Sequence, residues 1–205
     1  RARPAHGRRL PAAGRRPGGA DAPDPLRAGQ GAGARAEADR QARELRHRLA
    51  IEDRQVLIAF VGKLIPIKRP FDLLRAFSML SPECRHQAAL LFVGEGLLKS
   101  DLRAASHSHD LKNVHFLDFQ NQTIMPSVYA AADLLVLPSQ NETWGLVVNE
   151  AMNLACPAVV SDHVGCGPDL IIPDETGWVF PTGDVYALRD CLAQAIRHPT
   201  TLKQM

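Results

Sequence analysis

The chain has few of the features that mark disulfide-rich, metal-binding or membrane-spanning proteins. Its 205 residues include four cysteines, whose positions match no metal-ligand or redox spacing. We therefore expect free, mostly buried thiols, as in a cytoplasmic enzyme with a large core. No apolar run reaches the length of about eighteen residues that a membrane span requires. The amino-terminal segment also lacks the apolar stretch of a secretory signal.

Aromatic residues are scarce as well, at 5% of the chain, and the positive charge is unevenly distributed. Residues 1–50 contain twelve arginines and five acidic residues, whereas the remainder of the chain is mildly acidic. A basic segment can bind nucleic acid or an anionic membrane. This one has no aromatic residue for base stacking and no amphipathic stripe, so we interpret it as a solvated tail and expect no nucleic-acid partner.

The first residues are also of low complexity. Of residues 1–34, twenty-eight are Arg, Ala, Gly or Pro. Such a composition buries too little apolar surface to offset chain ordering, so we predict a disordered arm over residues 1–35. We predict a helix and linker over residues 36–54 and one domain over residues 55–205. Because the chain begins with Arg rather than Met, our hypothesis is that it is a fragment.

Strands and helices alternate through the rest of the chain. Near-continuous apolar strands are typical of parallel sheets that are covered on both faces, and their alternation with helices predicts an α/β, Rossmann-like doubly wound sheet. The predicted strands are Val56–Val61, Ala88–Val93, Val114–Leu117, Leu134–Leu137, Ala158–Val160 and Trp178–Phe180. The predicted helices are Ala36–Ala50, Phe71–Leu80, Leu97–Ser106, Ile124–Ala132, Gly145–Ala155 and Val185–Arg197.

Ligands of such sheets bind beyond the carboxyl ends of the strands, so the loops there are the candidate sites. After the first strand, Gly62 permits a turn, and Lys63 and Lys68 precede a helix. Two cations beside a helix start suit a diphosphate, although ordinary solvated lysines explain the spacing equally well. Gly94, after the second strand, permits close approach of the backbone to a ligand or serves as a plain turn.

The loop after Leu134–Leu137 carries two carboxylates, Glu142 and Glu150, on either side of a helix start. Backbone N–H groups at a helix start suit phosphate, and carboxylates accept hydrogen bonds from sugar hydroxyls. If the segment were wholly helical, the two acids would stand about 12 Å apart. That span matches a hexose, diphosphate and ribose laid end to end.

Two other groupings are weaker candidates. His107 and His109 could chelate a metal, but no further ligand lies at a recognised spacing, so we predict no metal site. Ser161, Asp162 and His163 contain the residue types of a hydrolase triad, but adjacent side chains diverge.

The segment from Glu142 to Met152 resembles the E-x7-E motif of the retaining GT-B glycosyltransferases, in particular family 4 (glycosyl transferases group 1). Further segments are similar to that family in the same order, over about Val56 to Met205. They are Gly62 to Lys68, Val93 to Gly96, Val114 to Phe119, Tyr129 to Asp133, Pro138-Ser139, Ser161-Asp162 with Gly165 to Pro168, Glu175 to Gly177 and Pro181 to Asp184.

The resemblance implies the carboxyl-terminal, donor-binding half of a GT-B enzyme, with a nucleotide-diphosphate sugar as donor substrate and no cofactor. Lys63, where the family usually has Arg, and Lys68 would bind the diphosphate; Glu142 would contact the sugar and Glu150 the ribose. The remaining implied donor-binding residues are Gly62 and Gly94, Phe119 and Asn121 beside the base (with Asp118 in place of the usual Gly), and Thr143, Trp144, Gly145 and Leu146.

The implied reaction transfers a sugar to an acceptor hydroxyl of a glycan, lipid or small molecule. We expect a cytoplasmic protein that associates with the inner face of the membrane or pairs with a missing amino-terminal half. The alternative is a non-catalytic nucleotide-sugar-binding module or an inactive truncated product, because the first fifty or so residues are too few to form an acceptor domain.

Overall fold

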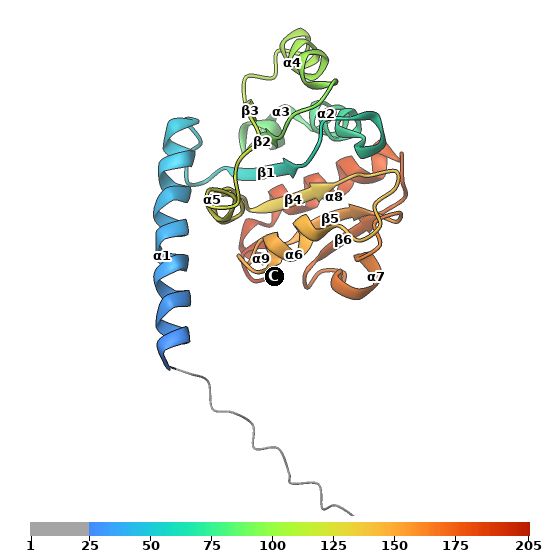
Figure 1. The fold of residues 1–205 in the computed structure, drawn as a ribbon. Helices are drawn as coiled ribbons and strands as arrows, with labels where there is room; N and C mark the ends of the chain where they lie inside the picture. The colour runs from blue at the N-terminus through green and yellow to red at the C-terminus, as the bar shows by residue number, and fades with distance from the viewer. Residues whose placement is uncertain (1–24) are drawn as a thin grey trace, which may run out of the picture.

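The computed structural model describes the backbone of residues 25–205 and the side chains from residue 33 onward. Its centre is one parallel sheet of six strands in the order β3-β2-β1-β4-β5-β6 (Figure 1). Chain order reverses between β1 and β4, as in doubly wound folds. The strands are β1 (Val56–Val61), β2 (Ala88–Val93), β3 (Val114–Leu117), β4 (Leu134–Leu137), β5 (Ala158–Ser161) and β6 (Gly177–Phe180).

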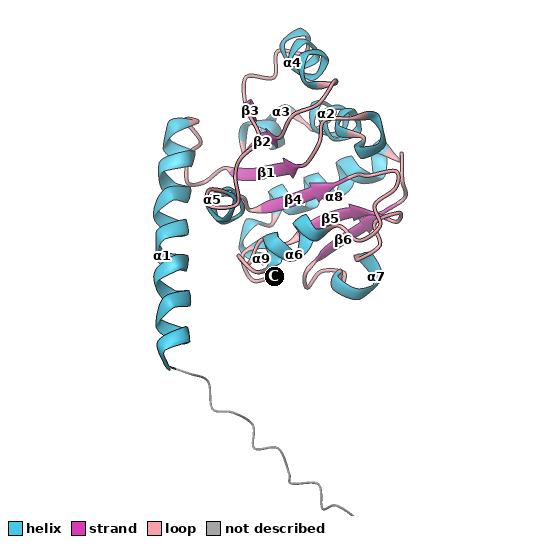
Figure 2. Ribbon diagram, in the orientation of Figure 1, coloured by secondary structure: helices cyan, strands magenta, loops and turns pink. Residues whose placement is uncertain are grey.

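Helices cover both faces of this sheet (Figure 2). The fold class predicted from the sequence is therefore confirmed. The helices are α1 (Pro25–Arg48), the short 3-10 helix η1 (Pro66–Lys68), α2 (Pro70–Ser78), α3 (Pro82–His86), α4 (Lys99–Ser108), α5 (Met125–Ala131), α6 (Leu146–Met152), α7 (Gly167–Leu170), α8 (Val185–Arg197) and α9 (Pro199–Leu202).

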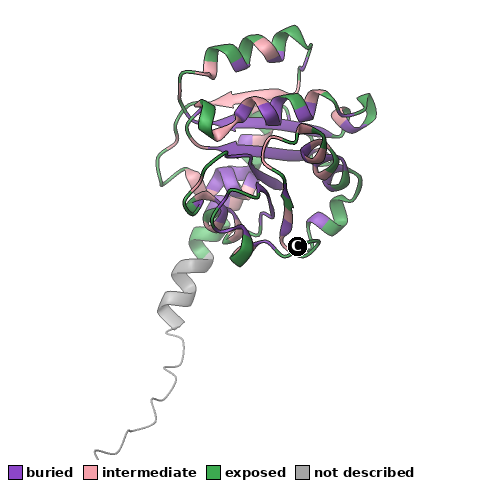
Figure 3. Ribbon diagram, turned by 90° about the vertical axis from the view of Figure 1, so that its right-hand side faces the viewer, coloured by how far each residue is buried: buried purple, intermediate pink, exposed green. Residues whose placement is uncertain are grey.

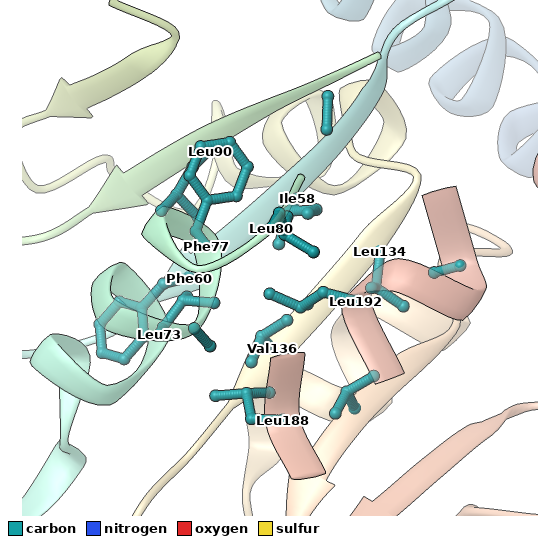
Figure 4. Packing of buried hydrophobic residues seen from close by; sticks show 14 of the residues in the cluster. Ile58, Phe60, Leu73, Phe77, Leu80, Leu90, Leu134, Val136, Leu188 and Leu192 are labelled. Carbon is teal, nitrogen blue, oxygen red and sulfur yellow. The ribbon is translucent and has the colours of Figure 1, made fainter. Parts of the chain in front are cut away.

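The strands alternate their side chains between two hydrophobic cores. Ile58 and Phe60 of β1 point to the core beneath α2 and α8, whereas Leu57 and Ala59 point to the opposite core. In the first core, α2 and α8 meet strand residues from β1, β2 and β4 (Figure 4). All six side chains of β1 are buried, which explains why the strand is a continuous apolar run.

The edge strand β3 differs from the central ones. Each of its residues is only partly buried (Figure 3). Phe116 stacks on Phe92 of β2, with a ring-centroid distance of 5.3 Å, and the Arg103 guanidinium lies over the outer side of the Phe116 ring. This edge is therefore held by backbone pairing to β2 and by the contacts of Phe116.

The first helix corrects part of the sequence prediction. It begins at Pro25 rather than at the predicted Ala36, and residues 1–24 of the predicted arm lie outside the described part of the chain. Once a helix is nucleated, each further residue adds a hydrogen bond at small cost, and the Ala, Arg and Gln of this segment are good helix formers, although its three glycines oppose the helix. Low complexity did not exclude a helix.

The carboxyl-terminal half of α1 packs beside α5. Ala42 and Leu45 are buried in the second core. The guanidinium group of Arg46 anchors the helix to the domain. Its Nη1 donates to the Ala131 carbonyl (2.8 Å) and to Asp133 (2.9 Å), and its Nη2 donates to the Gln55 carbonyl (2.6 Å). The segment predicted as helix and linker thus lies against the domain. None of the described helices is long and apolar enough to cross a membrane.

Candidate donor site at the carboxyl edge of the sheet

The loops after β1 and β4 meet where the strand order reverses. The Gln140 N–H donates to the Ile67 carbonyl over 2.8 Å, which joins the two loops directly. In the β4 loop, the Ser139 carbonyl accepts a hydrogen bond of 2.5 Å from the Ser161 hydroxyl at the end of β5. Three neighbouring strands therefore end in loops that hold one another in place, at the position where doubly wound sheets bind ligands.

An ion pair between Lys68 and Glu142 spans the two central loops. Their side chains are 22% and 20% exposed, so the pair is accessible but largely shielded from water. Lys68 is the last residue of η1, and Glu142 forms a parallel β-bridge to Val164. Two residues that the sequence analysis assigned to diphosphate and sugar thus lie together, although 74 positions separate them in the chain.

The segment from Glu142 to Trp144 lies flat against the loop after β5. The Glu142 N–H donates to the His163 carbonyl (3.2 Å), the Gly165 N–H to the Glu142 carbonyl (2.9 Å), and the Cys166 N–H to the Trp144 carbonyl (2.9 Å). A Cβ at Gly165 would lie 2.0 Å from the Thr143 carbonyl oxygen. Only glycine allows this close approach.

Gly145 ends this extended segment and starts α6. Its φ of 99° lies in the left-handed region that favours glycine. No side chain caps the first turn of α6, so its first N–H groups donate to no side chain within the described residues. The assumption of a wholly helical segment from Glu142 to Glu150 is therefore wrong, and the distance of about 12 Å derived from it does not apply.

The side chains around this helix start are exposed. Leu146 is 69% exposed and Trp144 is 38% exposed. The Trp144 indole N–H donates to Asn149 Oδ1 over 2.8 Å, which holds the ring across the first turn of α6. Thr143 is also exposed. These residues form the rim of the site rather than part of the core.

Glu150 lies one turn further along α6 and has a partner that the sequence analysis did not identify. The Tyr129 hydroxyl of α5 donates to Glu150 Oε2 over 2.6 Å. Tyr129 is only 2% exposed, and burial, with the neighbouring carboxylate, raises its pKa above the usual range. No spacing rule links residues 21 positions apart on different helices, so the contact had no signal beyond the resemblance of the Tyr129 to Asp133 segment.

Gly62 and Gly94 lie against each other after β1 and β2. A Cβ at Gly94 would stand 2.0 Å from the Gly62 carbonyl oxygen, so the second glycine packs against backbone. Lys63 follows Gly62 and is exposed, and it forms no ion pair within the described residues. The structure thus places Lys63 at the same edge as Lys68 but free in solvent.

The residues expected beside the base lie further along this edge. Phe119 follows β3, two strands from β1, and is 76% exposed. The Asn121 Oδ1 accepts hydrogen bonds of 3.1 Å from the N–H groups of Thr123 and Ile124. Asp118 pairs with Lys99, and this contact lowers the pKa of its carboxyl. Phe119 is therefore open to a ligand, whereas the Asn121 side chain shapes the turn before α5.

The groupings that the sequence analysis set aside remain separate. Asp162 accepts hydrogen bonds from the Thr182 N–H and hydroxyl, whereas His163 Nδ1 lies 3.0 Å from the Gln140 carbonyl, so with Ser161 they form no triad. Within residues 33–205, no group of three or more His, Cys, Asp or Glu side chains is placed to hold a metal. The cysteines are free, as predicted: Cys84, Cys156 and Cys166 are buried and Cys191 is half-buried.

A separate cavity of about 620 Å³ lies at the opposite, amino-terminal edge of the strands. His86, His109 and His115 are among its lining residues. None of the candidate donor-binding residues lines it. The candidate donor-binding residues lie at the other, carboxyl edge of the sheet.

The sequence profile of the family described as Glycosyl transferases group 1 matches residues 41–205. The chain is 34% identical over 154 residues to D-inositol 3-phosphate glycosyltransferase of Saccharomonospora viridis, which covers 70% of this chain and 35% of that protein. It is 34% identical over 158 residues to sulfoquinovosyl transferase of Arabidopsis thaliana, covering 75% of this chain and 29% of that protein. The chain thus spans about a third of the length of these relatives.

Solved structures share the fold of this chain. The structure of Anabaena HepE in complex with UDP and glucose matches with a TM-score of 0.70 at 23% identity, covering 80% of this chain and 44% of that one. Sucrose-phosphate synthase of Thermosynechococcus elongatus matches with a TM-score of 0.67 at 26% identity, covering 78% and 40%.

Proposed function

Because the chain belongs to the glycosyl transferases group 1 family, we propose that its carboxyl edge binds a nucleotide-diphosphate sugar. We further propose that the protein transfers the sugar to an acceptor hydroxyl with retention of anomeric configuration, as in family 4 of the GT-B enzymes. The observation that carries this proposal is the meeting of Lys68, Glu142 and the uncapped start of α6 at the point where the strand order reverses.

Each of these groups has a role in the proposed reaction. Lys68, Lys63 and the first N–H groups of α6 stabilise the charge that develops on the leaving diphosphate, which is how fixed dipoles and cations lower a transfer barrier. Glu142 accepts hydrogen bonds from the sugar, and Glu150 from the ribose. Gly62, Gly94 and the backbone from Thr143 to Leu146 allow close approach, and Phe119 lies beside the base. No metal is required by this scheme.

The Lys68–Glu142 ion pair has a consequence for donor binding. In the free protein, the Glu142 carboxylate is paired with the Lys68 ammonium group, which the diphosphate also needs. A nucleotide sugar replaces both partners at once, because its diphosphate binds Lys68 and its hydroxyls bind Glu142. A nucleoside diphosphate without sugar takes Lys68 from Glu142 but offers the Glu142 carboxylate no hydroxyl in return, so the carboxylate faces the negative diphosphate. The ion pair therefore favours the donor over the spent nucleotide.

A panel of radiolabelled UDP-glucose, UDP-N-acetylglucosamine, GDP-mannose and ADP-glucose tests the proposal. We expect one donor to bind and to be transferred or slowly hydrolysed by this chain, with Lys68→Gln weakening binding at least tenfold and the distant exposed Lys112→Gln leaving it unchanged. Binding without turnover would support the alternative, a nucleotide-sugar-binding module, which the short span relative to the curated relatives keeps open. No binding of any donor would contradict both.

A further inference from the structure

Tyr129 and Glu150 form a contact at the donor edge for which the scheme above has no role. Tyr129 lies on α5 and Glu150 on α6, two helices that pack against each other over the same face of the sheet. The phenol is almost fully buried, and its hydroxyl donates to one carboxylate oxygen, Oε2. Glu150 itself lies on the exposed side of α6.

A glutamate at an exposed helix position is conformationally free. Its terminal torsion is broad, so both carboxylate oxygens sample many directions unless a partner fixes one of them. The Tyr129 hydroxyl supplies such a partner from the rigid side of the site. With Oε2 held, Oε1 keeps its acceptor positions for a ligand, because an ionised carboxylate can accept about four hydrogen bonds.

The phenol is suited to remain a donor. Burial and the adjacent carboxylate both disfavour the phenolate, which raises the pKa of Tyr129 above its ordinary value of about 10. Throughout the physiological pH range the hydroxyl therefore keeps its proton, and the hydrogen bond to Glu150 persists.

We propose that Tyr129 is a positioning residue that orients the Glu150 carboxylate toward the ribose hydroxyls of the donor and thereby sets the selection of ribonucleotides over deoxyribonucleotides. This inference rests on the proposed function, in which Glu150 holds the ribose. A purely structural tyrosine would satisfy its own buried hydroxyl and affect all ligands equally. A positioning residue affects ligands that carry ribose hydroxyls more than those that lack them.

The test pairs a substitution with a change in the ligand. UDP, GDP and ADP, each against its 2′,3′-dideoxy counterpart, are titrated calorimetrically into the chain, and the ratio of the two dissociation constants gives the ribose preference. We expect Tyr129→Phe, which keeps the ring packing, to lower that preference about tenfold, the size of one charge-assisted hydrogen bond. Glu150→Gln should lower it similarly, and the double variant no further.

Tyr186→Phe is the matched control, since it removes the hydroxyl of the only other tyrosine, which is 64% exposed. It should leave the preference unchanged. If Tyr129→Phe weakens ribo and dideoxy ligands by the same factor, or keeps the full preference while Glu150→Gln loses it, the positioning role is wrong and the proposed function stands. If the unsubstituted chain shows no ribose preference, or binds none of the three diphosphates, the donor-site assignment itself fails.

Discussion

At the scale of single residues, the site depends on charges that are paired before any ligand arrives. Lys68 and Glu142 are each about one-fifth exposed, so their mutual attraction is moderate rather than that of a deeply buried pair. Removing one charge changes what the other offers to a ligand. The chain therefore permits the two charges to be tested separately.

Glu142→Gln should raise the affinity for UDP, or for whichever nucleoside diphosphate binds, by about threefold, because the glutamine no longer repels the diphosphate or competes for Lys68. The same change should weaken binding of the intact nucleotide sugar. Calorimetric titration at low and high salt measures both effects, and Glu95→Gln, which removes an exposed carboxylate paired with a different lysine, is the control. Equal weakening of both ligands would show that Glu142 does not distinguish them.

Gly165→Ala tests the close approach beneath the donor loop. The added Cβ would lie 2.0 Å from the Thr143 carbonyl oxygen, so the segment from Glu142 to Trp144 must move. We expect donor affinity to fall at least tenfold, because the Glu142 side chain is displaced with its backbone. Gly33→Ala is the matched control, since a Cβ there meets nothing within 4 Å. Unchanged donor binding in Gly165→Ala would mean that the loop tolerates the shift or takes no part in binding.

Burial of the thiols also predicts that the cysteines react slowly in the native protein. Burial raises the pKa of the Cys191 thiol to about 11, and burial raises the pKa of Cys166 as well. Because the pKa is raised, each thiol stays protonated at neutral pH, and the reactive thiolate forms only as the pH approaches that raised pKa. At pH 8, roughly one Cys191 side chain in a thousand is a thiolate. We expect slow labelling by a thiol reagent in the native protein and rapid labelling of all four cysteines in urea. Fast native labelling would contradict the burial.

At the scale of helices and strands, Arg46 is the residue that fixes α1 to the domain. It reaches Asp133, which also accepts the Leu57 N–H over 2.8 Å, and the Arg46 side chain is only 13% exposed. Arg46→Met should lower the free energy of unfolding by about 2 kcal/mol, because a shielded carboxylate and three carbonyl groups lose their donor. Urea unfolding measures this change, and Arg43→Met, an exposed arginine of the same helix, should cost far less. Equal costs would mean that α1 is not anchored there.

The elements also show what periodicity can predict. Four of the six strands have the predicted bounds, and the other two gain one residue each, because buried parallel strands are uninterrupted apolar runs. The helices α3, α7 and α9 were missed, since four or five residues are too few to show a helical period. The start of α1 was missed because its low-complexity stretch, rich in Ala and Gly, shows no helical period.

The candidate site was predictable to a similar degree. The motif around Glu142 and the rule about strand ends placed Lys68, Glu142 and the start of α6 at the carboxyl edge of the sheet, where the structure has them, and their roles in binding stay predictions. The ion pair, the Tyr129 contact and the local role of Asn121 were not predictable, because each depends on side-chain directions that only the packed loops define.

At the scale of the whole molecule, the sheet separates the proposed donor edge from the edge that carries the largest histidine content among the described cavities' linings. Loops at the carboxyl ends carry the paired charges, glycines and exposed rim, whereas the amino ends carry the histidine-lined cavity. The chain spans about a third of the curated relatives' length, so the acceptor and the complete transfer reaction stay proposals. The proposed donor site uses only residues of the described part of the chain.

The most direct test of the donor edge is hydrogen–deuterium exchange of this chain with and without a saturating donor. We predict slower exchange in residues 62–68 and 142–150, where the diphosphate and sugar would contact backbone and side chains, and no change in residues 107–115 at the other edge. Protection confined to the histidine-lined cavity, or spread evenly over the sheet, would contradict it.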